Sequence, residues 1–427
     1  MTSNNSADAY ILPDSGQTLC YDDFGYVISC HTTGQDGEYN INSMNFTSNG
    51  DYTVTDNNTG LIWKKCSVGQ NDDATCSGTA ATFNWYQATG TEDATYNPVG
   101  SYRNACGELS GDWRLPTKRE LMSLVDFSIP SPGPTIQTTY FKNTPSLSRY
   151  WSSTTMGAGN PAYSTTGWAM DFGYGDIYGT LRTDTYFVRC VHGQQTAQNF
   201  IDNHDATVTD TRTGLTWQQC TVGQDPSTNC GGSYTIFTWD NAVSYCNDLV
   251  FPPSGAVFSD WRLPNPKEFE SLQDDSLWNP SINRTFFPNN PTSAYHTSTT
   301  DASTPTHNWW AGFVGNTNGS NIKKNSVGVV RCVRGGSLGN FARLIHENSP
   351  VDDYLTLRDA YEAANEEDII EAQAVDSTEN LTLSGNISVT LKGGYDSGFV
   401  TNSGFTQVNS IIIDGSGSVA IDNIRIR

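Results

Sequence analysis

The chain carries one sequence pattern twice. Residues 53–63 read TVTDNNTGLIW, and residues 207–217 read TVTDTRTGLTW. Two further motifs recur in the same order: DWRLP at 112–116 and 260–264, and VRCV at 188–191 and 330–333. The offset falls from 154 residues (207 − 53) to 142 (330 − 188), and the length differences lie in polar or Gly/Pro/Ser-containing stretches typical of surface loops. A repeat of this kind predicts two copies of one domain.

The repeat divides the chain into four parts. We place the first copy at residues 51–194 and the second at residues 205–336. Residues 1–50 form a lead-in segment, and residues 345–427 form a separate C-terminal piece. A chain of 427 residues has the length of two or three domains, which agrees with this division.

Each copy combines short helices with short strands. In the second copy, apolar residues at helical spacing predict a helix over 239–249. A proline followed by an early glutamate predicts a second helix over 264–272, and the first copy repeats this pattern from Pro116 to Leu124. Alternating strands follow and end with the VRCV motifs. The expected fold class is α+β, with two tandem domains.

The ten cysteines fall largely in matched positions. The duplicated pattern favours two disulfides in each copy and a further one in the lead-in segment. The expected pairs are Cys66–Cys76, Cys106–Cys190, Cys220–Cys230, Cys246–Cys332 and Cys20–Cys30. An even cysteine count suits an oxidising compartment. Zinc binding is disfavoured, because no cysteines have C-x₂₋₄-C spacing and no histidine recurs beside them.

The charge balance limits the partners. Lys and Arg total 23 and Asp and Glu total 45, so the net charge is −22. Such a surface repels nucleic acids, heparin-like polymers and anionic membranes. No apolar run reaches the length of a membrane span. The first ten residues are polar, so we expect that an export signal was removed or lies outside this numbering. The predicted location is extracellular or on the cell surface of a bacterium.

The C-terminal piece has a different pattern. Residues 355–364 predict a short helix, and alternating strands follow, separated in part by Gly-rich turns at 393–394 and 415–417. A helix followed by short strands with regular turns resembles the N-terminal cap and first coils of a pectate-lyase-like parallel β-helix. The last strand runs to Arg427, so we expect this end to meet further chain or another subunit, which includes self-assembly.

The ordered motifs of the two copies resemble one known family. The order T-V-T-D-x-x-T-G-L-x-W, D-W-R-L-P-x-x-x-E-L (D-W-R-L-P-x-x-x-E-F in the second copy), Y-W-S-S-T-T (Y-H-T-S-T-T in the second copy) and V-R-C-V-x-G is similar to the DUF1566 family, also called the Lcl C-terminal domain family. This resemblance implies a fold like that of C-type lectins and formylglycine-generating enzymes. It also implies a bacterial surface protein that binds a ligand, with links to adhesion and glycans. A chain with a charge of −22 is a poor candidate for the sulfated glycans associated with the collagen-like adhesin of that family.

Several motifs have structural interpretations that we favour. In DWRLP we expect a core tryptophan, an arginine paired with a buried carboxylate (Glu120 or Glu268) and a proline that starts a helix. Residues 56–58 predict a turn and not a calcium loop, because the second copy has Arg212 there. Residues 335–339 match a nucleophile-elbow pattern that the first copy lacks, so a hydrolase site is disfavoured. We expect no enzymatic activity and no cofactor, although calcium binding stays open.

The ligand surface is expected between the Y-W-S-S-T-T strand and the last strand. Aromatic rings with carboxylates and amides suit the apolar faces and hydroxyl rims of sugars. The predicted ligand residues are Tyr163, Asp171, Tyr174, Asp176 and Tyr178 in the first copy and His307, Asn308, Trp309 and Asn316 in the second. An offset of 142 pairs Trp168 with Trp310, and we expect this pair to be core. Tyr174, Tyr178 and Trp309 have no match at that offset and are expected to be exposed.

The leading hypothesis is an extracellular bacterial adhesion or recognition protein that binds a glycan or another surface ligand through aromatic-rich loops. The alternative is a structural subunit of an extracellular filament or surface appendage.

Overall fold

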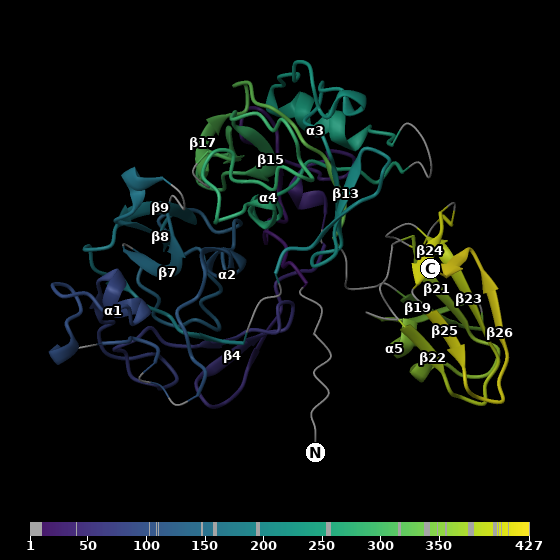
Figure 1. Ribbon diagram of the computed structural model, residues 1–427, viewed down its shortest axis with the longest axis horizontal. Helices are drawn as coiled ribbons and strands as arrows, with labels where there is room; N and C mark the ends of the chain where they lie inside the picture. The colour runs from purple at the N-terminus through teal and green to yellow at the C-terminus, as the bar shows by residue number, and fades with distance from the viewer. Residues whose placement is uncertain are drawn as a thin grey trace. The chain divides into compact units, whose positions relative to one another are not determined.

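The computed structural model describes residues 11–426 apart from short gaps (Figure 1). The gaps are residues 40, 102, 108, 110, 147, 157–159, 194–196, 253–257, 315–316, 337–341, 348, 355–356, 375–379, 396–398, 400, 403 and 409. Asn316, Arg427 and most of the nucleophile-elbow pattern therefore lie outside the described residues. Within the described part, strands dominate a fold that we expected to be α+β, and the α-helices are few and short.

The chain forms two compact units. The first contains the lead-in segment and most of both copies, over residues 1–212, 216–249 and 261–333. The second contains residues 334–427 with two short pieces, residues 213–215 and 250–260. The described α-helices are α1 (Trp85–Thr89), α2 (Lys118–Ser123), α3 (Trp239–Asn247), α4 (Pro266–Leu272) and α5 (Leu357–Ala363).

The first copy contains two sheets. The smaller has the order β11-β5-β4-β3, formed by Val191–His192, Ile62–Lys64, Thr53–Asp56 and Phe46–Ser48. The larger has the order β6-β10-β7-β8-β9, formed by Thr82–Phe83, Tyr186–Phe187, Arg149–Thr155, Thr166–Asp171 and Asp176–Leu181. Strands β7, β8 and β9 lie side by side in Figure 1 and pair antiparallel.

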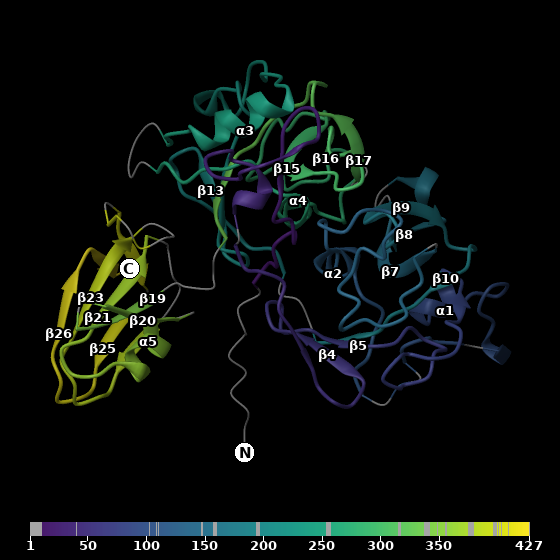
Figure 2. The ribbon, with the colours of Figure 1, turned by 180° about the vertical axis from the view of Figure 1, so that it is seen from behind.

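The second copy repeats this arrangement with fewer strands. Its first sheet has the order β12-β13-β14-β18, formed by Phe200–Asp202, Thr207–Asp210, Leu215–Gln218 and Val333–Gly335. Its second sheet has the order β15-β16-β17, formed by Tyr295–Thr300, His307–Gly312 and Thr317–Lys323 (Figure 2). Both copies therefore place one tryptophan strand, β5 or β14, next to the strand that follows the VRCV cysteine.

Equivalent buried residues stabilise the core of each copy in the same way. Trp63 and Trp217 are fully buried in matching strands. The buried Tyr150 hydroxyl pairs with the Ser67 hydroxyl at 2.7 Å, and that of Tyr295 pairs with Thr221 at 2.7 Å. The two tyrosines are 145 residues apart (295 − 150), so strands β7 and β15 correspond to each other at this offset.

The helix that follows DWRLP begins two residues after the proline expected to start it, at Lys118 in α2 and at Pro266 in α4. Thr117 caps α2 and Asn265 caps α4, each in a capping box with the glutamate three residues on. The same two glutamates, Glu120 and Glu268, are the carboxylates that pair with the DWRLP arginines. One carboxylate thus closes the helix start and neutralises the arginine, which explains why these residues occur at fixed spacing.

All five predicted disulfides are present. Cys66–Cys76 and Cys220–Cys230 close short loops after the tryptophan strands. The other bridges are Cys106–Cys190, Cys246–Cys332 and Cys20–Cys30. No cysteine of the chain is left free.

The two copies contact each other through α2 and α4. Arg119 of α2 donates to the backbone carbonyl of Gln273 at 2.6 Å. In return, Lys267 of α4 donates to the carbonyl of Ser123 at 3.0 Å. Each helix therefore neutralises the carbonyl-rich C-terminal end of the other with a basic side chain.

The lead-in segment binds both copies. It contains β1 (Cys20–Tyr21), β2 (Val27–Ile28) and the 3₁₀ turn η1 (Asp36–Glu38). Phe127 of the first copy donates its N–H to the carbonyl of Ser15 at 2.9 Å. Gln17 exchanges two hydrogen bonds with the backbone of Thr300 in the second copy, at 2.8 and 2.9 Å. Figure 2 shows this purple segment beside α4 and β15.

Parallel strand pairing dominates the C-terminal piece after its first hairpin. Its strands are β19 (Ala342–His346), β20 (Ser349–Tyr354), β21 (Ile369–Gln373), β22 (Asn380–Leu383), β23 (Val389–Tyr395), β24 (Thr406–Val408), β25 (Ser410–Ile413), β26 (Val419–Asp422) and β27 (Ile424–Ile426). β21, β23 and β26 form one parallel ladder, β22 and β25 a second, and β24 and β27 a third. Their inward residues, with α5, form a separate apolar core.

Candidate ligand site

A row of charged side chains crosses the larger sheet of the first copy. Arg149 on β7 lies directly opposite Asp171 on β8, and Asp171 lies opposite Asp176 on β9. Residues directly opposite each other in neighbouring strands project from the same face of a sheet. The three side chains therefore form one continuous row, called here the Arg149 row, and two of them are predicted ligand residues.

Aromatic rings flank this row. The Arg149 guanidinium lies 4.2 Å from the centroid of the Tyr178 ring and 5.6 Å from that of Tyr186. Arg149 Nε is 3.9 Å from Asp171 Oδ2, and the Tyr186 hydroxyl accepts from Arg149 Nη1 at 3.3 Å. The guanidinium is thus held by two rings and one carboxylate and keeps about a third of its side chain exposed, at 29%.

The acids of the row are shifted towards the neutral form. Burial raises the pKa of Asp176 to about 7, and the nearby Asp171 carboxylate adds to the shift. Burial also raises the pKa of Asp171. Burial and the Asp176 charge raise the pKa of Tyr178 to about 12, so its hydroxyl stays protonated. Near neutral pH the row therefore offers both donors and acceptors of hydrogen bonds.

The other two predicted residues of the first copy lie in different surroundings. Tyr174, in the turn between β8 and β9, is 51% exposed, as expected. Tyr163 ends the 3₁₀ turn η3 (Pro161–Tyr163), and its ring stacks on Trp278 of the second copy with centroids 4.2 Å apart. Tyr163 is therefore a contact between the copies, which sequence spacing does not reveal.

The prediction for the second copy is wrong at Trp309. Trp309 is 4% exposed, and Trp310, expected in the core, is only partly buried. The true counterpart of Trp168 is Trp309, at an offset of 141, because Ser152 and Thr297 donate to the carbonyls of these two tryptophans. A shift of one residue moves a side chain to the other face of a strand, so the offset of 142 exchanged core and surface.

Other predicted residues of β16 are also withdrawn from solvent. Asn308 is fully buried, and its amide donates to the Trp309 carbonyl. Its neighbour His307 is partly buried, and one ring nitrogen lies 3.1 Å from the Thr306 hydroxyl. The predicted aromatic surface of the second copy is therefore not formed by these residues.

The second copy does not repeat the Arg149 row. The offsets of 145 and 141 place Ala294 and Gly312 where the first copy has Arg149 and Asp171. Gly312 pairs with Thr317, and Trp310 pairs with Gly319, which puts Thr317 and Gly319 at the positions of Asp176 and Tyr178. The two copies therefore share a core and differ completely at this row.

Comparison with known proteins assigns the two copies to one family. Residues 52–192 and again residues 206–334 match the model of the Lcl C-terminal domain. The chain belongs to the Lcl C-terminal domain family. No curated protein matches the chain.

The DWRLP and VRCV arginines of both Lcl C-terminal domains are structural. Arg114 and Arg262 pair with the helix glutamates, as predicted. Arg189 is fully buried and donates to the backbone carbonyls of Lys64 and Lys65. Of the DWRLP tryptophans, only Trp261 is a core residue, because the Trp113 ring stays partly exposed beside the Lys64 ammonium at 5.7 Å.

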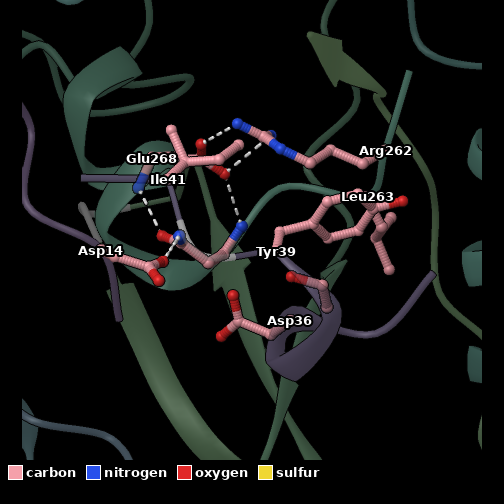
Figure 3. Close-up of a pocket in the computed structure, with 9 residues that line it drawn as sticks. Asp14, Asp36, Tyr39, Ile41, Arg262, Leu263 and Glu268 are labelled. Carbon is pink, nitrogen blue, oxygen red and sulfur yellow. Dashed lines mark hydrogen bonds and ion pairs between the residues drawn. The ribbon is translucent and has the colours of Figure 1, made fainter. Parts of the chain in front are cut away.

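A small polar pocket lies where the lead-in segment meets the second Lcl C-terminal domain (Figure 3). Its cavity of about 10 Å³ has room for about one water molecule. Asp14 accepts from Asn265, Asp36 accepts from Thr299, and Glu268 is held by an arginine. Burial raises the pKa of Asp36 to about 6. The pocket is a structural junction with no space for an organic ligand, and no pattern in the sequence predicts the burial of its two aspartates.

The described part of the chain contains no group of three or more His, Cys, Asp or Glu side chains able to hold a metal ion. Residues 56–58 form the predicted turn, with Asp56 buried and accepting from the backbone of Asn58 and Thr59. No described helix is long and apolar enough to cross a membrane.

Proposed function

We propose that the protein is an extracellular recognition protein whose first Lcl C-terminal domain binds a saccharide at the Arg149 row. The observation that carries this proposal is the difference between the two domains. Their matching cores fold without the row in the second domain, so the row is not required by the fold. A partly exposed arginine, two aspartates and a tyrosine supply hydrogen bonds and an apolar ring face, which is the chemistry that sugars need.

The extracellular location is part of the same proposal. Five disulfides support an oxidising compartment, such as a bacterial periplasm or cell exterior. The bridges Cys106–Cys190 and Cys246–Cys332 each join the region of the first helix to the residue just before the last strand, which supports a C-type-lectin-like arrangement in each domain. We propose binding without turnover, although the acid pair Asp171 and Asp176 makes hydrolysis worth measuring.

A glycan array with matched variants tests the proposal. The wild-type chain should bind a subset of neutral or cationic glycans, and Tyr178→Ala should reduce that signal at least tenfold. Tyr234→Ala is the control, because Tyr234 is a 42% exposed tyrosine of the second domain, outside the row. Equal loss in both variants, or no glycan bound by the wild type, would contradict the proposal. Release of reducing sugar from a bound glycan would contradict the absence of turnover.

We propose assembly of copies as the second candidate function, supported by the C-terminal piece. We infer that this piece is a short parallel β-helix, because Asn380 pairs with Ser410 and Val389 with Val419, each 30 residues further on (410 − 380 and 419 − 389). Leu383 of β22 and Leu391 of β23 are buried, and they pair with Ile413 of β25 and Ile421 of β26 in the next coil. Those two isoleucines are 49% and 45% exposed. This apolar face fits a further layer of parallel strands.

Sedimentation velocity of the purified chain tests the assembly candidate. We expect concentration-dependent oligomers in the wild type and monomers in Ile413→Lys/Ile421→Lys. A wild type that stays monomeric at high concentration would remove this candidate and leave the recognition proposal untouched.

A further inference from the structure

The disulfide-closed hairpin of the lead-in segment, residues 20–30, displays large apolar side chains to solvent. Phe24 is 80% exposed, Tyr26 71% and Val27 60%. Apolar side chains this exposed and this close together mark an interaction surface more often than a random surface feature. This surface, called here the Phe24 hairpin, is separate from the Arg149 row, which lies in the sheet of the first domain.

The tip of the hairpin is held in one conformation. Asp22 Oδ1 accepts from the backbone N–H of Phe24 at 3.0 Å and from that of Tyr26 at 2.8 Å. Gly25 adopts a positive φ of 84°, and a Cβ there would lie 3.3 Å from Pro305 Cβ. The two aromatic residues are therefore presented by an ordered turn, which lowers the entropy lost on binding.

The base of the hairpin is fixed both to the rest of the lead-in segment and to the second domain. Tyr21 is buried, and the Gln35 amide pairs with both its N–H and its carbonyl at 3.0 Å. Buried Lys324 donates to the same carbonyl at 3.2 Å. These contacts leave the side chains of β2 as the outward face. The exposure of Phe24 and Tyr26 is thus a property of a well-anchored element.

Carboxylates surround the apolar tip. Asp22 and Asp23 lie in the turn, and Asp240 of α3 interacts directly with Asp23. Burial and the Asp23 carboxyl raise the pKa of Asp240 to about 6, and the positive charge of Lys324 offsets only part of this increase. The rim is therefore acidic, as is the whole chain. It disfavours a second copy of this chain or an anionic membrane, and it favours a partner with positive charge.

We propose that the Phe24 hairpin is a docking element for a basic protein partner, with Phe24 and Tyr26 packing against exposed apolar side chains of that partner that are flanked by Lys or Arg. Two adjacent aromatic anchors with a charged rim match the usual anatomy of a binding hot spot. The acidic rim selects the partner and speeds encounter, and the rings supply the buried area. This function is independent of saccharide binding.

Defined peptide probes test the proposal on the full chain. The probes are immobilised 12-residue peptides of alternating Leu and Lys, compared with peptides of alternating Ser and Lys, in 150 mM salt to weaken long-range attraction. The wild type should bind the Leu/Lys peptide at least tenfold more tightly than the Ser/Lys peptide. Phe24→Ala/Tyr26→Ala should abolish that preference, and Asp23→Asn should weaken binding to both peptides.

The control variant is Tyr52→Ala, which removes a 42% exposed tyrosine of the first copy and should bind as the wild type does. All these side chains are exposed, so the fold is preserved, and far-ultraviolet circular dichroism checks this. Equal affinity of the double variant and the wild type, or no binding of either peptide, would overturn the proposal. Hairpin-dependent binding to phosphatidylcholine vesicles instead of the peptide would also overturn it and identify a lipid surface.

Discussion

Replacement of Lys118 by Met removes the central charge of the contact between the two Lcl C-terminal domains. Lys118 is 1% exposed, and its ammonium lies 3.0 Å from Glu270 and 3.2 Å from Asp275 of the other domain. It also donates to Gln273 Oε1 at 2.7 Å. Lys118→Met leaves Glu270, itself 1% exposed, without its buried partner. Loss of one member of a buried pair costs about 3–5 kcal/mol, and we expect about 3 kcal/mol at pH 8 because Glu270 retains the nearby Arg119 charge.

The cost of Lys118→Met should depend on pH. Burial already raises the pKa of Glu270 above its usual range, and loss of the ammonium raises it further. A carboxyl whose folded pKa is raised contributes stability below its unfolded pKa and loses it as the pH rises through the folded value. The destabilisation should therefore be smaller at pH 5 than at pH 8. Urea unfolding followed by tryptophan fluorescence at both pH values measures it.

A double variant provides the matched control. The first domain has Met122 at the position of Glu270 (270 − 148 = 122), so Lys118→Met/Glu270→Met places at residue 270 the side chain that the first domain already has there. It should recover most of the lost stability, because replacing both charges removes the uncompensated one. A single variant that costs under about 1 kcal/mol at pH 8, an equal cost at both pH values, or no recovery in the double variant would refute the reasoning.

Three further predictions concern stability. Trp309→Ala should cost about 3–5 kcal/mol and Trp310→Ala less than about 1 kcal/mol in urea unfolding, and the reverse order would show that the offset of 141 is wrong. Asp36→Asn should stabilise the chain by up to about 3 kcal/mol at pH 8 and have little effect at pH 4. The reason is that ionised Asp36 destabilises the native state only as the pH passes its raised pKa of about 6. A gain in stability that is as large at pH 4 as at pH 8 would contradict this explanation. Cys106→Ala/Cys190→Ala opens a bridge with a sequence separation of 84 and should cost about 5 kcal/mol, measured as a lower urea midpoint, and an unchanged midpoint would refute the bridge's role.

The duplicated motifs predicted the structural features that arise from residues close in sequence or matched between the two copies. Four of the five disulfides follow from matched cysteines, and the arginine–glutamate pairs follow from a fixed i to i+6 spacing. The helix starts were expected two residues early, because the prolines of DWRLP precede the capping residues Thr117 and Asn265. These features need no knowledge of distant contacts. Their recurrence in a second copy supplied an internal check.

The features that were missed depend on long-range packing. The slip of one residue at Trp309 arose in a stretch without anchoring motifs. The sequence did hold a signal of the correct offset, because Phe172 and Phe313 are also 141 residues apart. The stacking of Tyr163 on Trp278 joins residues 115 apart (278 − 163). The burial of Asp14 follows from the lead-in segment lying against the second domain, which no periodicity in a single polar segment indicates.

A crystal structure of the chain with its strongest-binding glycan from the array tests the central claim most directly. The account predicts a sugar ring stacked over Tyr178, with hydroxyl groups within hydrogen-bond distance of Arg149 and Asp176, and no sugar at the equivalent face of the second domain. A sugar bound away from the Arg149 row, or bound equally to both domains, would contradict it.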